Sequence, residues 1–278
     1  MNETIKRQRI NGFINRIAKI GIEVEGGWNA ALAGHKIIRD SSVVFSSSQP
    51  QVTIREIRLP DGRVQRDLIE IPPTKPSTIV PTIVGEIVMD PPMFVTGRWQ
   101  DWMRGAYPQH VNATCGLHIH MSFSHELNYQ RLMCPDYTMA MVIALTDFGN
   151  RESIPPDHVF WNRVGKPNHE HCAHVYRGDE QSKVARLDYH SRGKSYDRYT
   201  AINYPRAKHK TIECRLLPMF GTQPTTPDDA EQAIRALQVV IDTTNQFLSK
   251  IRQREVKMRT EVIGRQQVTQ EFGSWLNP

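Results

Sequence analysis

Thr114 to Phe123, with the sequence Thr-Cys-Gly-Leu-His-Ile-His-Met-Ser-Phe, is the stretch on which the fold of this chain depends. His118 and His120 lie two residues apart within an apolar run. Successive residues of a β-strand face opposite sides, so both imidazoles fall on one face and the apolar neighbours fall on the other. The stretch therefore predicts a strand with one metal-binding face and one core face.

Two further segments show the same alternation. The first, at residues 20–25, places Glu23 and Glu25 on one face, and the second places Glu213 beside Arg215. A buried charge is costly unless it is paired or coordinates a cation. The three segments thus predict one curved sheet with metal on its concave face and the core on its convex face. Ordinary amphipathic strands are the alternative, because antiparallel sheets commonly expose one face to solvent.

Composition places the chain among globular proteins. It has 278 residues, of which 39% are hydrophobic and 23% charged, and its net charge is +6. No apolar run is long enough to span a bilayer, and no apolar segment follows the amino terminus as in a secretory signal. The four cysteines lack the CxxC spacing and are expected to be reduced. A cytoplasmic protein without membrane association is expected.

The domain prediction is a basic arm or helix at residues 1–19, followed by a single domain at residues 20–278. Residues 163–210 carry eleven Lys or Arg against five Asp or Glu, which favours an anionic partner such as a nucleotide or a nucleic acid. A solvated basic surface is the alternative. Hydrophobic periodicity is weak between residues 150 and 200, so this region is interpreted as loop, with residues 163–200 as a lid.

The remaining elements follow from local patterns. Gly26 and Gly27 are expected to end the first strand and to allow a close approach of backbone or ligand. The other expected strands are a hairpin of Thr53–Leu59 with Val64–Ile71, and a short strand within residues 85–92 that bears Glu86 and is ended by Pro91 and Pro92. The expected helices are a two-turn helix at Ala30–Gly34, a helix within 126–149 with Met139, Val142, Ile143 and Leu145 on its apolar side, and a helix capped by Thr226 with Pro227 in its first turn.

The polar residues indicate hard cations. Glutamates with histidine and without a cysteine pair favour Mg²⁺ or Mn²⁺ over zinc. Divalent cations beside an arginine are the ingredients of phosphoryl transfer. The chain has no GxxxxGK[ST] loop, so a nucleotide would be held in another way.

Five segments in order resemble the amidoligase family related to glutamine synthetase and glutamate-cysteine ligase, within the carboxylate-amine ligase superfamily. The resemblance implies an α+β, glutamine synthetase-like catalytic fold with helices on the convex face of the sheet. It also implies an ATP-dependent amide-bond-forming enzyme that phosphorylates a carboxylate and lets an amine displace the phosphate. The segments are Gly21–Glu25, Gly85–Val88, Cys115–His120, Arg198–Asn203 and Thr211–Leu216.

The resemblance also implies roles for individual residues. Glu25 and Glu86 would hold the metal near the acceptor carboxylate, while Glu23, His118 and Glu213 would hold the metal on the ATP phosphates. A second set of residues would act on the substrates: Arg215 would stabilise the transferred phosphoryl group, and Arg198 and Asn203 would line the nucleotide or substrate side. Glu86 and His120 are also expected to be catalytic, and His120 would act either as a metal ligand or through a structural hydrogen bond.

Two positions depart from the family pattern. Ser41 stands where glycine is usual after Asp40, and Met89-Asp90 replaces a serine before Pro91.

The implied partners are a carboxylate acceptor, an amine donor, an ammonia-supplying amidotransferase and a second copy of the chain. Three alternatives stay open: a guanidino-kinase-like phosphotransferase, a metal-dependent nucleic-acid-binding protein or nuclease, and, for the cluster of His169, His171, Cys172 and His174, a zinc site in place of lid contacts.

Overall fold

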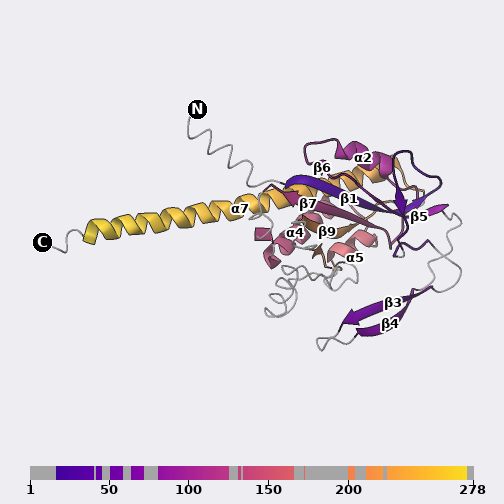
Figure 1. Ribbon diagram of the computed structural model, residues 1–278, viewed down its shortest axis with the longest axis horizontal. Coiled ribbons are helices and arrows are strands. Elements are labelled where there is room, and N and C mark those ends of the chain that lie inside the picture. The colour runs from indigo at the N-terminus through magenta and orange to yellow at the C-terminus, as the bar shows by residue number, and fades with distance from the viewer. Residues whose placement is uncertain are drawn as a thin grey trace.

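The computed structural model describes part of the chain, drawn in colour in Figure 1. The described residues are 17–40, 42–45, 51–58, 64–71, 81–124, 131–132, 134–165, 172, 200–203, 211–221 and 224–273. The predicted arm at residues 1–19 therefore lies mostly outside them, and its last three residues belong to the first strand. Most of the predicted lid also lies outside the described residues.

A seven-stranded sheet forms the centre of the protein (Figure 1). Its strand order is β2-β5-β1-β7-β9-β8, with β6 paired to β1, and its strand pairings are antiparallel. The prediction of an α+β protein with a mainly antiparallel sheet is confirmed. The strands are β1 (Ile17–Trp28), β2 (Ile37–Ile38), β5 (Ile83–Val88), β6 (Met93–Phe94), β7 (Gly116–Phe123), β8 (Ile202–Asn203) and β9 (Thr211–Pro218).

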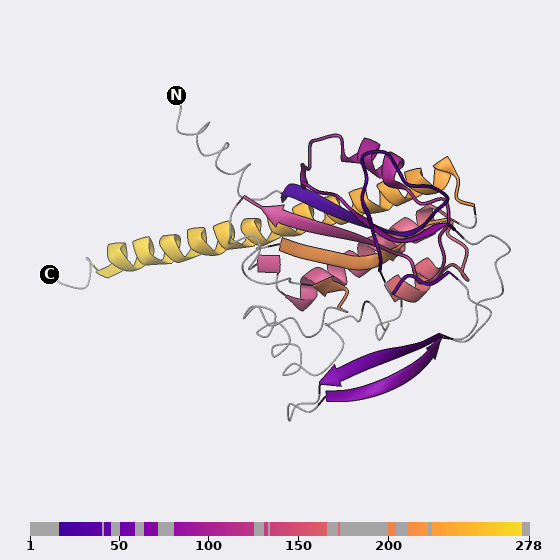
Figure 2. The same ribbon diagram turned by 45° about the vertical axis from the view of Figure 1, so that its right-hand side comes forward.

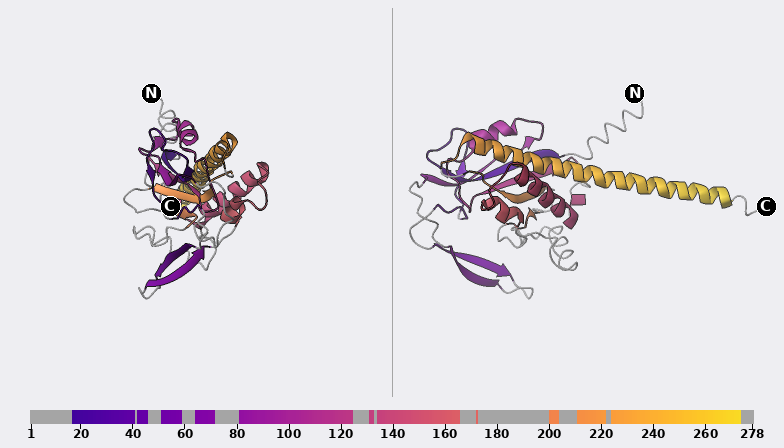
Figure 3. Two further views of the ribbon diagram at one scale, coloured as in Figure 1. Left: turned by 90° about the vertical axis from the view of Figure 1, so that its right-hand side faces the viewer. Right: turned by 180° about the vertical axis from the view of Figure 1, so that it is seen from behind.

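One face of this sheet is the core. The three central strands bury their alternate apolar residues completely, and the helix α7 (Pro227–Gly273) packs against them, with the Thr244 hydroxyl 3.5 Å from Met121 Sδ. The view from behind shows α7 and α4 (Pro135–Arg151) covering this side (Figure 3). Each such side chain contributes roughly 1.5–3 kcal/mol when fully buried. The buried rows are Ile20, Ile22 and Val24 on β1, Leu117, Ile119 and Met121 on β7, and Ile212, Cys214 and Leu216 on β9.

Gly26 and Gly27 do not end β1, which continues to Trp28. They are needed for close packing instead. A Cβ on Gly26 would lie 2.5 Å from Pro108 Cβ, and one on Gly27 would lie 2.4 Å from Pro81 Cγ. A close approach was expected, but the nearest group is a proline ring in both cases and not the predicted backbone or ligand.

The predicted hairpin is present. β3 (Gln51–Arg58) and β4 (Val64–Ile71) pair antiparallel, with Arg58 opposite Val64 at the turn. They form a two-stranded sheet of their own and join no strand of the main sheet, as Figure 2 shows. The predicted strand bearing Glu86 is β5, which ends before Pro91 as expected.

Two helix predictions need correction, and two helices were missed. Residues 30–34 form no helix; only Ala33 and Gly34 form a turn, with Gly34 at φ +78°. In α4, Met139 and Ile143 are exposed, because the buried stripe is centred on Tyr137, Met141 and Leu145. Two short helices were not predicted at all, α2 (Trp99–Ala106) and α5 (Val159–Gly165).

The start of α7 follows the predicted cap. The Thr226 N–H donates to Asp229 Oδ2 at 2.7 Å, and the Asp229 N–H donates to Thr226 Oγ1 at 3.4 Å, a reciprocal pair that satisfies two free amides. The helix then continues to Gly273 and extends beyond the body of the protein (Figure 1). Among the described residues, no helix has the length and apolar character needed to cross a membrane.

Candidate metal centre

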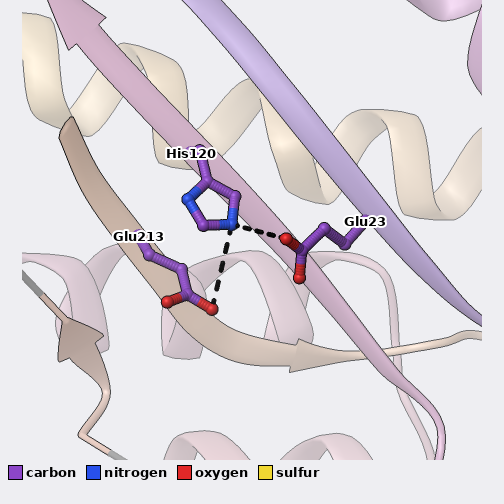
Figure 4. A group of neighbouring side chains, drawn as sticks. All are labelled: Glu23, His120 and Glu213. Carbon is purple, nitrogen blue, oxygen red and sulfur yellow. Dashed lines mark hydrogen bonds and ion pairs between the residues drawn. The ribbon is translucent and has the colours of Figure 1, made fainter. Parts of the chain in front are cut away.

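The face of the sheet opposite the core carries the predicted polar residues. Strand register brings them together, because Glu23 on β1 lies opposite His118 on β7, and His120 on β7 lies opposite Glu213 on β9. Figure 4 shows three of them, Glu23, His120 and Glu213, in front of the strands, with helices behind the sheet. The sequence prediction that the three strands share one polar face is confirmed.

The first cluster, called the Glu213 group here, consists of Glu23, His120 and Glu213. One ligand atom from each lies within 4.8 Å of the others. His120 Nε2 is 2.9 Å from Glu23 Oε1 and 4.0 Å from Glu213 Oε1 (Figure 4). Two carboxylates and an imidazole at this spacing can converge on one cation.

The second cluster, called the Glu86 group, consists of Glu25, Asp40 and Glu86. Their ligand atoms also lie within 4.8 Å of one another. Glu25 and Glu86 are directly opposite in the pairing of β1 with β5, and Asp40 follows β2, which pairs with β5 on its other side. Sequence analysis did not assign Asp40 as a ligand, although the resemblance of its segment to a family element marked the position.

His118 lies between the two groups. Its Nδ1 is 3.2 Å from Glu23 Oε2 and 3.7 Å from Glu213 Oε1, and its Nε2 is 3.9 Å from Glu25 Oε1. The side chain is buried. The structure thus adds His120 to the pair Glu23 and Glu213, and places His118 within reach of both groups.

Glu213 is held from two sides. Arg215 Nη1 donates to Glu213 Oε1, and Asn203 Nδ2 donates to Glu213 Oε2 at 2.8 Å. Asn203 lies opposite Glu213 in the pairing of β8 with β9 and is only 4% exposed. Its observed role is therefore to orient a carboxylate, while its role toward a nucleotide stays a prediction. Arg198 lies outside the described residues.

Glycine is required at position 116. The Gly116 N–H donates to Glu25 Oε2. A Cβ at this residue would lie 2.6 Å from His118 Nε2, 2.9 Å from Glu25 Oε2 and 3.0 Å from Arg163 Nη1. Arg163 was not predicted as a site residue. It belongs to α5, where the sequence had placed only the start of a lid.

The acidic side chains have divergent pKa values. Burial opposes ionisation of Glu23, but hydrogen bonds from His118 and His120 outweigh it and hold the Glu23 pKa well below its usual range. Burial also opposes ionisation of Glu213, and Arg215 with the two histidines outweighs it, so this pKa is lowered too. For Glu86, burial and the charges of Glu23 and Asp40 raise the pKa to about 7.

The donors present fit divalent cations. Carboxylate oxygens are what Mg²⁺ and Mn²⁺ prefer, and one imidazole is compatible with Mn²⁺. Two buried polar atoms beside the Glu213 group, Asn203 Oδ1 and Arg215 Nε, have no hydrogen-bond partner. Buried polar atoms are rarely left unpaired, so these two atoms are unusual. Of the proposed zinc cluster, Cys172 is buried and its Sγ contacts the Arg163 carbonyl, while the three histidines lie outside the described residues.

The chain matches no protein-family model, and it shows no significant similarity to a curated protein or to a solved structure.

The raised pKa of Glu86 predicts that the stability of the metal-free protein depends on pH. Its pKa rises from 4.5 in the unfolded chain to about 7, so its protonated form is favoured by folding. Its contribution to stability is complete below pH 4.5 and is lost as the pH rises toward 7. The Tm of wild type relative to that of Glu86→Gln, measured in EDTA from pH 4.5 to 7.5, should therefore fall as the pH rises. A constant difference would show that Glu86 titrates normally.

The hydrogen bond from Asn203 to Glu213 predicts that substituting Asn203 will weaken metal binding. Removing its amide in Asn203→Ala frees Glu213 Oε2, and loss of a hydrogen bond to a metal ligand typically costs about 10–100-fold in affinity. Titration with Mn²⁺, followed through the electron paramagnetic resonance signal of the free ion, measures this change. The matched control is Asn112→Ala, a residue whose hydrogen bonds run to the backbone of Val44 and to Thr114 instead. Equal affinities in both variants would contradict an orienting role.

Proposed function

We propose that this protein is an ATP-dependent carboxylate-amine ligase that forms an amide bond with the help of two or more divalent cations, Mg²⁺ or Mn²⁺. The observation that carries the proposal is the adjacent placement of the Glu213 group and the Glu86 group on one face of an antiparallel sheet. An arginine, Arg215, belongs to the same face. The sheet with its helices on the opposite face also supports a glutamine synthetase-like catalytic fold.

The two groups differ in a way that suits two tasks. The Glu213 group carries low carboxylate pKa values and an arginine, so it stays ionised and suits the cation that accompanies nucleotide phosphates. The Glu86 group has three carboxylates and a raised Glu86 pKa, so it would become fully ionised on binding a cation, and it suits the side of the acceptor carboxylate. When bound, the cations would neutralise phosphate charge and align the reacting oxygens.

The chain's own residues would complete the site. Arg215 would offer its guanidinium, which is partly exposed, to the transferred phosphoryl group. His120 is in hydrogen-bond contact with Glu23, and its pKa is raised because this bond and the charge of Glu213 outweigh the effect of burial. It would therefore orient Glu23 in the ligand-free protein. The products of the reaction are ADP, phosphate and an amide, and the acceptor carboxylate becomes an acyl phosphate before the amine attacks it.

Substrates and partners belong to the same proposal. A carboxylate acceptor and an amine donor are required, and an ammonia-supplying amidotransferase is one source of the amine. Arg198 and Asn203 are proposed to line the nucleotide or substrate side. The lid predicted at residues 163–200 cannot include its first three residues, because these belong to α5 and Arg163 is buried, so only the part after Gly165 is proposed to close over the site.

Hydroxylamine provides the test, because it traps acyl phosphates as hydroxamates without knowledge of the natural amine. The protein is incubated with ATP, Mg²⁺ or Mn²⁺ and hydroxylamine against a panel of amino acids, peptides and dicarboxylates. Binding of Mn²⁺ and of a non-hydrolysable ATP analogue is measured in parallel by calorimetry. We expect ATP-dependent hydroxamate formation, with release of both ADP and phosphate, that is lost in Glu213→Gln. Glu231→Gln, an exposed carboxylate outside both groups, should match wild type.

Other outcomes identify other functions. Formation of ADP without phosphate release, with a guanidino substrate, would identify a phosphotransferase. Cleavage of DNA or RNA with Mn²⁺ in the absence of ATP would identify a nuclease. A protein that binds neither Mn²⁺ nor the nucleotide analogue would refute the ligase.

A further inference from the structure

Arg163 is a charged side chain inside the protein that neither metal group accounts for. It is 2% exposed and ranks among the largest fully buried side chains. Its Nη1 donates to the Leu217 carbonyl at 3.4 Å and its Nη2 to the Thr114 carbonyl at 3.5 Å, both long hydrogen bonds. Its Nε has no partner. A guanidinium keeps its charge in proteins, so a full positive charge is buried here with weak compensation.

The guanidinium faces the Glu86 group through Gly116. Arg163 Nη1, Glu25 Oε2 and His118 Nε2 all lie within 3.0 Å of the point where a Cβ of residue 116 would stand. Because residue 116 is a glycine, Arg163 can lie close to Glu25 across the space that a side chain would fill. The two side chains do not contact each other directly. Because Arg163 has almost no exposed surface, a ligand arriving from solvent would not touch it. Its charge acts on the site through space.

We infer that Arg163 is a positioning residue that serves as an internal counter-cation for the Glu86 group, holding Glu25 in place when no metal is bound and weakening the binding of a cation there. The inference rests on the proposed metal-dependent function. Glu25, Asp40 and Glu86 bring three carboxylates together, and their repulsion needs a nearby positive charge in the metal-free state. Each group then has its own guanidinium, Arg215 in contact with Glu213 and Arg163 beside Glu25. A divalent cation and Arg163 neutralise the same carboxylates and oppose each other.

Three variants separate charge from packing. Arg163→Gln and Arg163→Met remove the charge, the first keeping a donor for the two carbonyls and the second keeping only bulk, while Arg163→Lys keeps the charge. Mn²⁺ binding to each purified, folded variant is measured through the electron paramagnetic resonance signal of the free ion. At an effective dielectric constant of about 20, loss of a unit charge near the site should tighten one Mn²⁺ site about tenfold or more. Arg163→Lys should stay within about threefold of wild type.

A double-mutant cycle in EDTA tests the metal-free half of the inference. Arg163→Gln should lower Tm clearly more in wild type than in a Glu25→Gln background, because the charge it compensates is then gone. A purely structural role would lower Tm equally in both backgrounds and leave Mn²⁺ affinity unchanged.

The outcomes keep the two proposals apart. Neutral variants that bind Mn²⁺ as wild type does, or more weakly, overturn the inference and leave the ligase standing. If wild type itself binds no Mn²⁺, the proposed metal function fails, and the EDTA cycle alone decides whether Arg163 compensates Glu25. Additive Tm changes in that cycle also overturn the inference.

Discussion

Glutamine at Glu23, Glu25 or Glu213 is expected to reduce ATP turnover at least about a hundredfold in each variant, because a neutral amide is a much poorer ligand for Mg²⁺ than a carboxylate. The measured quantities are hydroxamate formation and the number of bound Mn²⁺ ions per chain. Glu23 and Glu213 belong to one group of ligands and Glu25 to the other. Each substitution should therefore abolish one Mn²⁺ site and leave the other.

Stability should respond differently in the three variants. The charge of Glu25 is one of those that raise the Glu86 pKa, so Glu25→Gln relieves repulsion, but it also removes the carboxylate that accepts from the Gly116 N–H and lies near Arg163. The two effects oppose each other, so Glu25→Gln should change the Tm of the metal-free protein less than Glu23→Gln does. Glu23 accepts hydrogen bonds from both histidines, so Glu23→Gln should lower Tm. Glu231→Gln provides the control for a surface carboxylate, whose exposed ion pair with Arg104 is screened by solvent and should matter little to stability. Turnover within about tenfold of wild type in all three variants would show that these carboxylates bind no catalytic metal.

The polar face of the sheet was predictable because side chains alternate between the two faces of a strand, so the sequence shows which residues share a face. A period of two assigns the polar residues of each strand to one face, and burial of the apolar face puts Glu23, His118 and Glu213 on the same side of the sheet. Their mutual distances were not predictable in the same way, since these depend on register. The pairing of Glu23 with His118, and of His120 with Glu213, is fixed by contacts between segments more than ninety residues apart.

Residues outside such periodic segments were missed for the same reason. Asp40 follows a strand of two residues, and Arg163 lies on a helix of seven residues, both too short for a hydrophobic period to show. Their positions follow from the packing of β2 on β5 and of α5 near β9, and no local pattern encodes this packing. The exposed Met139 and Ile143 of α4 illustrate the converse error, where apolar residues at helical spacing suggested a buried face that tertiary packing placed in solvent.

Arg215→Lys is expected to fail nearly as badly as Arg215→Ala. The planar guanidinium can donate to Glu213 and to phosphate oxygens at once, while an ammonium group is a compact point charge without this fork. Arg215 Nη1 already donates to Glu213, and the side chain is 15% exposed, so part of the guanidinium can be reached by a second acceptor. If the charge it meets develops mainly in the transition state, the loss is about 2.7–4 kcal/mol, or roughly 100- to 1,000-fold in kcat.

Binding measurements separate this role from that of a structural ion pair. The dissociation constant of the ATP analogue should change by less than kcat in both Arg215 variants, because the interaction strengthens only as the phosphoryl group is transferred. Arg235→Lys is the matched control, since this arginine forms an exposed ion pair with Glu152 far from the sheet's polar face and should leave kcat unchanged. A lysine variant of Arg215 with the kcat of wild type, and with the Tm loss confined to the alanine variant, would mean that Arg215 serves only to hold Glu213 in place.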